Sequence, residues 1–280
     1  MSITPDSLSL FEGKIVAVTG GARGIGKNIV NAFAQKGAMV IVCDLNDKEG
    51  HTTVTDLRDR KLSSTFLKVD LSEKGTPQEM IRQIVRSYGK IDVLVNNARA
   101  VRSRDKSDDE ESWDLEMAVN LRAAFFASQA AISTMAKNGG GSIVNISSIT
   151  GLLSAREVSP VYQIAKVGLT QMTRYFAVRG GAEGVRVNAL LPGVIIRDED
   201  LDRYRQDDNQ GYRELVEFCH PMGQPGRSDD VAHAALFLCS PNASYISGQC
   251  IVMDGGMSVQ EQFSLMLHFQ KRHDESSVPI

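Results

Sequence analysis

The sequence predicts an α/β protein, a single doubly wound Rossmann-type domain built on a seven-stranded parallel sheet with helices on both faces. Two observations carry this prediction. Short β-branched runs alternate with amphipathic helical stretches, which is typical of consecutive βαβ units. Runs such as VIVC and DVLVNN are apolar at successive positions, as expected of strands covered on both sides. No linker-like or repetitive segment divides the chain, so we expect one domain over residues 1–257.

The expected strands are short and follow one another at the spacing of βαβ units. They cover residues 14–19, 39–43, 64–70, 91–95, 141–147, 185–190 and 249–253. The helix after the first strand begins at Gly24 and places Ile25, Ile29 and Phe33 at positions i, i+4 and i+8. This spacing predicts an apolar stripe that packs on the sheet.

Two segments depart from the alternation. Residues 197–217 contain eight acidic and four basic residues, and they predict a helical insertion over residues 197–222 that serves as a substrate lid. Residues 258–280 form a C-terminal extension. This extension contains a pattern that resembles an apolar helix face, formed by Phe263, Met266, Leu267 and Phe269. We expect a partner subunit to cover this face.

Composition and charge exclude several classes of function. With 280 residues, of which 42% are hydrophobic, the chain can fill one large core. A net charge of −3 offers no broad basic surface, which argues against nucleic acid as a partner. No uncharged apolar run reaches the ~18 residues that cross a bilayer, and the first residues lack a signal pattern. The histidines and cysteines show no metal-ligand spacing. We expect a cytoplasmic protein that acts on a small molecule and binds neither membrane nor metal.

A glycine-rich turn directly follows the first expected strand. Residues 19–26 read TGGARGIG and lead into the first helix. Glycines at such a turn let the backbone approach a pyrophosphate, whose charge then lies against the free N–H groups of the helix. The alternative is a tight turn without a ligand. The expected cofactor-binding residues of this turn are Gly20, Arg23, Gly24, Ile25 and Gly26.

Asp44 ends the second expected strand, twenty residues after Gly24. A carboxylate at this offset is suited to bind ribose hydroxyls, and it repels a 2′-phosphate about 4 Å away by roughly 1 to 4 kcal/mol. Arg23 is the obvious cation that could compensate. We therefore expect NAD as the cofactor. The alternative role for Asp44 is that of a helix N-cap without a ligand.

Tyr162 and Lys166 are spaced by i and i+4 on one expected helix. A nearby cation lowers the pKa of a tyrosine, which then exchanges a proton with a substrate hydroxyl during hydride transfer. The alternative is a solvated cation–aromatic contact. Ser147 and Ser148 end a strand fourteen residues before Tyr162, where a hydroxyl can hold the substrate oxygen.

The chain resembles the classical short-chain dehydrogenase/reductase family over about residues 14–256. The resemblance is carried by motifs in family order: the glycine-rich turn, Asp70 in VDL, NNA at 96–98, Asn120, ISS, YxxxK, the Pro192-Gly193 pair and DGG at 254–256. It implies a general acid/base at Tyr162, whose pKa Lys166 lowers while also binding the nicotinamide ribose. It implies a substrate-orienting hydroxyl at Ser148, with Ser147 as second choice, and a relay water held by Asn120.

The resemblance also implies the remaining cofactor contacts. Asp70 and the backbone of Leu71 would meet the adenine, Asn96 the adenosine ribose, and the Ile195 N–H the carboxamide. It further implies a homotetramer, with a dimer as second choice. The expected activity is NAD(H)-dependent interconversion of a secondary alcohol and a ketone. The alternatives are an NADPH-dependent ketoreductase and a non-catalytic cofactor-binding regulator.

Two positions depart from the family pattern. Arg99 stands where the family usually has the glycine of NNAG, and Arg197 where it usually has a threonine that contacts the carboxamide. With Arg102 and Arg104, Arg99 forms a basic loop, and guanidinium groups suit carboxylates and phosphates. These three arginines favour an anionic substrate. The alternative is a solvated loop, balanced by acidic residues at 108–111.

Overall fold

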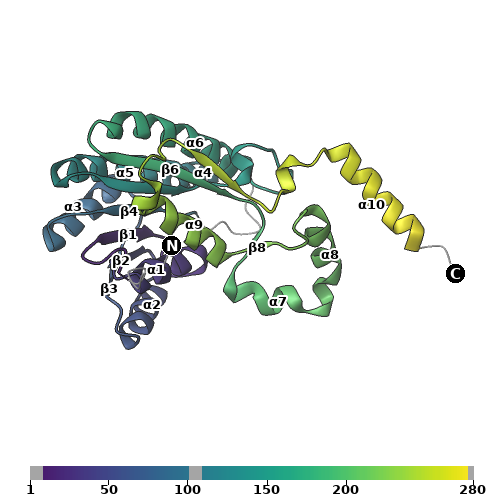
Figure 1. The fold of residues 1–280 in the computed structure, drawn as a ribbon, viewed down its shortest axis with the longest axis horizontal. Coiled ribbons are helices and arrows are strands. Elements are labelled where there is room, and N and C mark those ends of the chain that lie inside the picture. The colour runs from purple at the N-terminus through teal and green to yellow at the C-terminus, as the bar shows by residue number, and fades with distance from the viewer. Residues whose placement is uncertain (1–8, 101–108, 277–280) are drawn as a thin grey trace, which may run out of the picture.

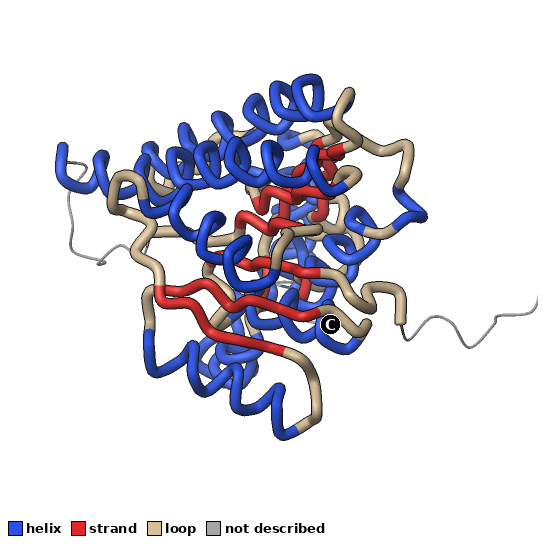
Figure 2. Tube along the Cα trace, turned by 90° about the vertical axis from the view of Figure 1, so that its left-hand side faces the viewer, coloured by secondary structure: helices blue, strands red, loops and turns tan. Residues whose placement is uncertain are grey.

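A computed structural model describes residues 9–100 and 109–276, and its core is one parallel sheet of seven strands. The strand order is β3-β2-β1-β4-β5-β6-β9, between two layers of helices (Figures 1 and 2). The fold prediction is confirmed, and each expected strand end lies within two residues of the observed one. The strands are β1 (Ile15–Thr19), β2 (Met39–Asp44), β3 (Ser64–Lys68), β4 (Val93–Asn96), β5 (Gly141–Ile146), β6 (Val185–Pro192) and β9 (Cys250–Met253).

Two apolar cores fill the two faces of this sheet, because successive strand residues point to opposite sides. Val16 and Val18 of β1 face one core, which contains Ile29 and Phe33 of the predicted stripe, and Ala17 faces the other. The first core is covered by α1 (Gly24–Gln35), α2 (Asp47–Asp59) and α9 (Ser228–Cys239). The second is covered by α3 (Thr76–Tyr88), α5 (Ala123–Met135) and α6 (Pro160–Gly181).

The order of the strands reverses beside β1, which pairs with β2 on one side and β4 on the other. In open α/β sheets this switch point places a ligand crevice at the carboxyl ends of the strands. A buried amide network fixes two of those ends. Asn96 Nδ2 of β4 donates to Asn145 Oδ1 of β5 at 2.8 Å, and Asn145 Nδ2 donates to Thr173 Oγ1 of α6, also at 2.8 Å.

The segment after β6 is helical, as predicted. It contains α7 (Leu201–Arg205) and α8 (Gln210–Cys219). The sequence did not indicate the small parallel sheet that flanks it, in which β7 (Ile195–Ile196) pairs with β8 (Gly226–Arg227). Because strands of two residues carry no periodicity, only tertiary contacts define them.

The C-terminal helix α10 (Gln262–Ser276) projects beyond the body on the side of α7 and α8 (Figure 1). Phe218 of α8 stacks on His268, with ring centroids 5.4 Å apart, and contacts Phe269 edge-on. Phe263, Met266 and Leu267 of the expected apolar face are exposed. Within the described ranges, no helix combines the length and apolar character that crossing a membrane requires.

Candidate active site

The candidate active site lies where the first turns of α6 meet the end of β5. Ser159 caps α6, and its hydroxyl accepts from the Tyr162 N–H at 3.4 Å. Lys166 follows one turn later, with Nζ 5.3 Å from the centroid of the Tyr162 ring. Lys166 is only 2% exposed, and Nζ donates to the Ile146 carbonyl at 2.7 Å. The contact between Tyr162 and Lys166 therefore lies in the interior. The alternative, a solvated cation–aromatic contact on the surface, does not apply.

The two serines after β5 have different roles. Ser147 Oγ donates to the Lys166 carbonyl at 2.9 Å, so this hydroxyl joins β5 to α6. Ser148 Oγ accepts from Thr150 N at 3.2 Å and lies in hydrogen-bonding contact with the Tyr162 phenol. Of the two candidates, Ser148 is thus the one that faces the tyrosine.

Asn120 lies in a single π-helical turn, Ala118–Arg122, between α4 (Glu110–Met117) and α5. Such turns are frequent at functional sites. Its Oδ1 accepts from Ala100 N at 3.1 Å, whereas its buried Nδ2 has no partner among the described residues. A cavity of about 10 Å³, which Asn120 and Thr19 help to line, adjoins this group. That volume is close to what one water molecule needs, about 10–15 Å³.

Burial sets the ionisation of the tyrosine and the lysine. Burial raises the pKa of Tyr162, with a contribution from the Glu116 carboxylate, while the Arg99 guanidinium and Ser148 act in the opposite direction. Burial, with repulsion from Arg99, lowers the pKa of Lys166 to about 7. Burial sets the direction of this shift in the pKa of Tyr162. The expected effect of Lys166 on the pKa of Tyr162 stays a prediction. Exclusion of water from the phenolate outweighs the effect of the neighbouring charges.

Sequence reasoning missed two residues that position Tyr162. Glu116 of α4 is buried, and its Oε1 accepts from the hydroxyl of the capping Ser159 at 3.0 Å. Gln163 binds both the N–H and the carbonyl of Ala155 at 2.9 Å, which orders the loop before α6. The spacing of Glu116, one turn before Asn120, is the signal that could have indicated its role.

The glycine-rich turn fits a dinucleotide. Gly20 has a φ of +63°, and a Cβ there would lie 2.9 Å from the Ala98 Cα. A Cβ on Gly26 would lie 2.0 Å from the Gly20 carbonyl oxygen, so only glycine permits this close turn. Asn97 Nδ2 donates to the carbonyls of Thr19 and Gly20 at 3.0 Å. The first turn of α1 has neither an acidic residue nor a side-chain cap, which leaves its N–H groups for an anion.

A family model described as enoyl-(acyl carrier protein) reductase matches residues 20–258. The chain belongs to the short-chain dehydrogenase/reductase family. It is 36% identical over 254 residues to a 3-oxoacyl-(acyl-carrier-protein) reductase of Chlamydia muridarum, an alignment that covers 89% of this chain and 99% of the relative. An uncharacterized oxidoreductase of Thermotoga maritima is 33% identical over 253 residues, covering 90% and 98%. The crystal structure of gox2181 matches with a TM-score of 0.80 at 30% identity, covering 91% of this chain and 99% of that one.

In this short-chain dehydrogenase/reductase, Asp44 and Arg23 are both engaged beside the glycine-rich turn. Asp44 accepts from Ala22 N at 3.1 Å and from Asn46 N at 3.0 Å. The N-cap of α2 is Asn46, so the helix-cap alternative for Asp44 does not apply. Arg23 Nε lies 3.9 Å from a carboxylate oxygen of Glu49. Beside this turn, the carboxylates of Asp44 and Glu49 therefore accompany the Arg23 guanidinium.

The other predicted cofactor residues, Asp70, Leu71, Asn96 and Ile195, lie in different surroundings. Asp70 lies just after β3 and accepts from Ser72 N at 2.9 Å, with Leu71 buried beside it. The Asn96 amide group donates into the interior, to Asn145 and to Ser128, so a ribose contact would come from its main chain. Ile195 pairs with Gly226 in the small sheet.

The predicted basic loop is described only at its start. Arg99 is exposed, and its charge acts on both Tyr162 and Lys166. Arg102 and Arg104 lie outside the described residues. Within the described part of the chain, no group of three or more histidine, cysteine or acidic side chains is placed to hold a metal ion.

Replacing Arg99 with alanine should raise the pKa of Lys166 above about 7, because a neighbouring guanidinium disfavours a second positive charge. An NMR titration of the lysine side chains, with Lys166→Met to assign the signal, measures this midpoint. Arg86→Ala on α3, where Arg86 pairs with Glu79, is the matched control and should leave it unchanged. An identical midpoint in the Arg99→Ala protein would contradict the electrostatic link.

Proposed function

We propose that the protein is an NAD(H)-dependent oxidoreductase that interconverts a secondary alcohol and a ketone. The observation that supports it best is the buried junction of Ser148, Tyr162 and Lys166 at the end of β5, beside a glycine-rich turn that fits a dinucleotide. Members of this family are oxidoreductases that bind a nicotinamide cofactor. Hydride transfer is the chemistry that the nicotinamide supplies when bound.

In this proposal, Ser148, Tyr162 and Lys166 have separate roles in proton transfer. Ser148 holds the substrate oxygen, and Tyr162 exchanges a proton with it. The raised pKa of Tyr162 keeps the phenol protonated at neutral pH, which is the form that donates a proton to a ketone oxygen. Lys166, with a pKa of about 7, binds and releases a proton near physiological pH. A water bound to Asn120 Nδ2 would extend this path toward solvent.

The cofactor preference rests on Asp44 and its surroundings. Asp44 ends β2 at the position where the resemblance puts the adenosine ribose, and Arg23 is already paired with Glu49. A 2′-phosphate there would meet repulsion from the Asp44 carboxylate, and Arg23 would have to leave Glu49 to compensate for it. This supports NAD(H) over the alternative, an NADPH-dependent ketoreductase.

Arg99 supports the proposal that the substrate is anionic. Its guanidinium is exposed, and its charge reaches both catalytic side chains. The Arg99 guanidinium could donate two parallel hydrogen bonds to a carboxylate or phosphate on the substrate. Arg102 and Arg104 belong to the same hypothesis by sequence.

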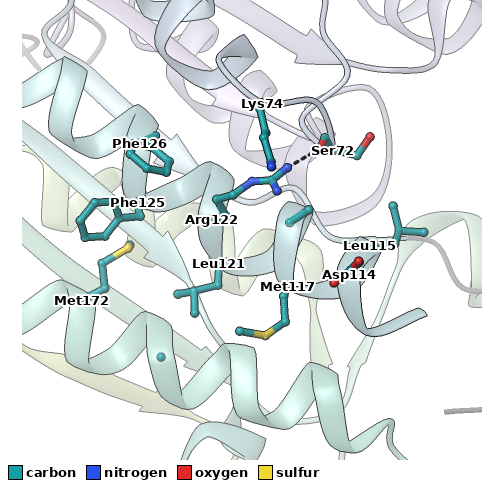
Figure 3. A pocket seen from close by; sticks show the side chains of 12 residues that line it. Ser72, Lys74, Asp114, Leu115, Met117, Leu121, Arg122, Phe125, Phe126 and Met172 are labelled. Carbon is teal, nitrogen blue, oxygen red and sulfur yellow. Dashed lines mark hydrogen bonds between the residues drawn. The ribbon is translucent and has the colours of Figure 1, made fainter. Parts of the chain in front are cut away.

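The described surface supports assembly into a homotetramer, with a dimer as second choice. Val167, Tyr175 and Val178 expose an apolar stripe along α6. Beside it, a cavity of about 710 Å³ opens between α5 and α6, lined by Leu121, Phe125, Phe126 and Met172 (Figure 3). The strand β9 forms an edge of the sheet and would provide a second interface. The extension at residues 258–280 would bury the exposed face of α10 on a partner subunit, and residues 197–222 would close as a lid.

A non-catalytic cofactor-binding regulator is the alternative from another class. It would share the glycine-rich turn but would have no chemical need for the buried Ser148, Tyr162 and Lys166 together.

Replacing Asp44 with asparagine should raise the affinity for NADP relative to NAD at least about tenfold, because the charge that repels the 2′-phosphate is removed. The ratio of the two dissociation constants, measured by calorimetry, is the readout, since the substitution also disturbs the Ala22 hydrogen bond. Asp56→Asn on α2, where Asp56 pairs with Lys27, is the control. An unchanged ratio would contradict the assignment of Asp44.

Tyr162→Phe should reduce turnover by about 10² to 10⁴-fold with little change in cofactor affinity. The assay is a panel of charged and neutral ketones and hydroxy compounds, followed by NADH absorbance, with Tyr175→Phe on the same helix as control. If cellular function survives Tyr162→Phe while cofactor binding remains, the regulator alternative is correct.

Arg99→Ala should raise the KM of an anionic substrate about tenfold or more and leave that of a neutral analogue unchanged, since a charge-assisted hydrogen bond is lost. Arg86→Ala again serves as the control. If the KM for the anionic compound barely moves, Arg99 does not bind substrate.

Light scattering after size-exclusion chromatography should give a mass of about four times the 30.6 kDa of one chain. A mass of two chains would indicate the dimer, and a mass of one chain would refute the proposed assembly.

A further inference from the structure

The turn that follows β7 lies directly on the glycine-rich turn. A Cβ built on Gly24 would be 3.0 Å from Arg197 Cδ and 3.3 Å from Glu199 Oε1. Gly24 is the first residue of α1, whose N–H groups face the position expected for the cofactor pyrophosphate. Two charged side chains from the start of the lid segment thus lie at the phosphate end of the cofactor site.

The charges of this turn are paired with one another. Arg197 Nη2 lies 2.6 Å from Asp200 Oδ2, and Arg197 Nη1 lies 3.4 Å from Glu199 Oε1. Asp200 and Glu199 are both about 40% exposed, so water can replace either contact at small cost. The guanidinium is therefore held near the site by partners that it can exchange.

A separate pair of contacts anchors the turn to the body of the protein. Asp198 accepts from Asn28 Nδ2 of α1 at 2.8 Å, and it lies 3.3 Å from Arg227 Nη2 at β8. Asp198 therefore links the turn to α1 and β8 through contacts that do not involve Arg197 or Glu199.

A carboxylate oxygen of Glu199 lies near the N-terminus of α1, 3.3 Å from the position that a Cβ on Gly24 would take. The first turn of this helix contains no acidic residue, and its N-cap residue Arg23 makes no capping hydrogen bond with its side chain. A carboxylate oxygen at a helix N-terminus occupies the kind of position that a phosphate oxygen takes.

We propose that Arg197 binds the pyrophosphate of the dinucleotide and that the pyrophosphate displaces the carboxylate of Glu199 from the N-terminus of α1. This assignment rests on the proposed cofactor function, and it gives Arg197 a role different from the carboxamide contact of the usual threonine. A guanidinium forms two parallel hydrogen bonds with a phosphate, which a hydroxyl cannot do. Binding the cofactor then exchanges the Arg197–Glu199 pair for an Arg197–phosphate pair and fastens the start of the lid segment over it.

Direct binding of ADP-ribose tests this, because that molecule has the pyrophosphate but no nicotinamide. By calorimetry, Arg197→Ala should weaken ADP-ribose and NAD by the same factor, about 10- to 100-fold, as expected for one or two charge-assisted hydrogen bonds. Glu199→Gln should strengthen ADP-ribose binding about two- to tenfold, because the competing charge is gone. Adenosine, which lacks phosphate, should bind all variants equally.

Arg205→Ala, an exposed arginine at the end of α7, is the matched control and should leave every constant unchanged. Circular dichroism of each variant confirms folding. A loss of affinity for NAD alone in Arg197→Ala would place Arg197 at the carboxamide and overturn the proposal, as would unchanged ADP-ribose binding in that variant. A wild-type protein that binds none of NAD, NADP or ADP-ribose would instead refute the proposed cofactor function, and with it this assignment.

Discussion

The candidate site depends on two hydrogen bonds that join α6 to the end of β5. Lys166 Nζ donates to the Ile146 carbonyl, and the Lys166 carbonyl accepts from Ser147 Oγ. Together they fix one turn of α6 against one strand end, so that Ser148 and Tyr162 face each other. Burying an amine in this way is costly, and its lowered pKa expresses that cost. Under the proposed function, the same burial, which lowers the pKa of Lys166 to about 7, lets this side chain exchange a proton near neutral pH.

The sheet could be predicted from the sequence because its signal is local. Buried parallel strands such as β1 and β2 are nearly continuous apolar runs, and α1 repeats its buried residues at helical spacing. The motif residues of the site were located for a related reason. Strand ends and helix starts fix where a side chain lies, so the positions of Ser148, Tyr162 and the glycine-rich turn follow from the order of elements.

The remainder depends on three-dimensional packing that spacing does not encode. The π-helical turn at Asn120 and the strands β7 and β8 arise from contacts between distant segments. The inward direction of the Asn96 amide depends on Asn145, which is 49 residues away. The direction of the Tyr162 pKa shift could not be obtained from its spacing to Lys166, because burial dominates it and burial is a property of the fold.

Charged side chains lie at two places around the candidate site. The Arg99 charge acts on Tyr162 and Lys166, and the turn at Arg197 lies over the N-terminus of α1. The net charge of −3 gives no indication of either group of charged side chains. The proposed function requires the buried Lys166 for efficient hydride transfer at this junction. The most direct test is transfer of deuterium from nicotinamide-labelled NADH to a ketone substrate in a single turnover, comparing wild type with Lys166→Met by mass spectrometry. At NADH concentrations that saturate both proteins, we expect labelled alcohol from the wild type and a rate at least about a hundredfold lower from the variant. Transfer at the wild-type rate in Lys166→Met would contradict the claim.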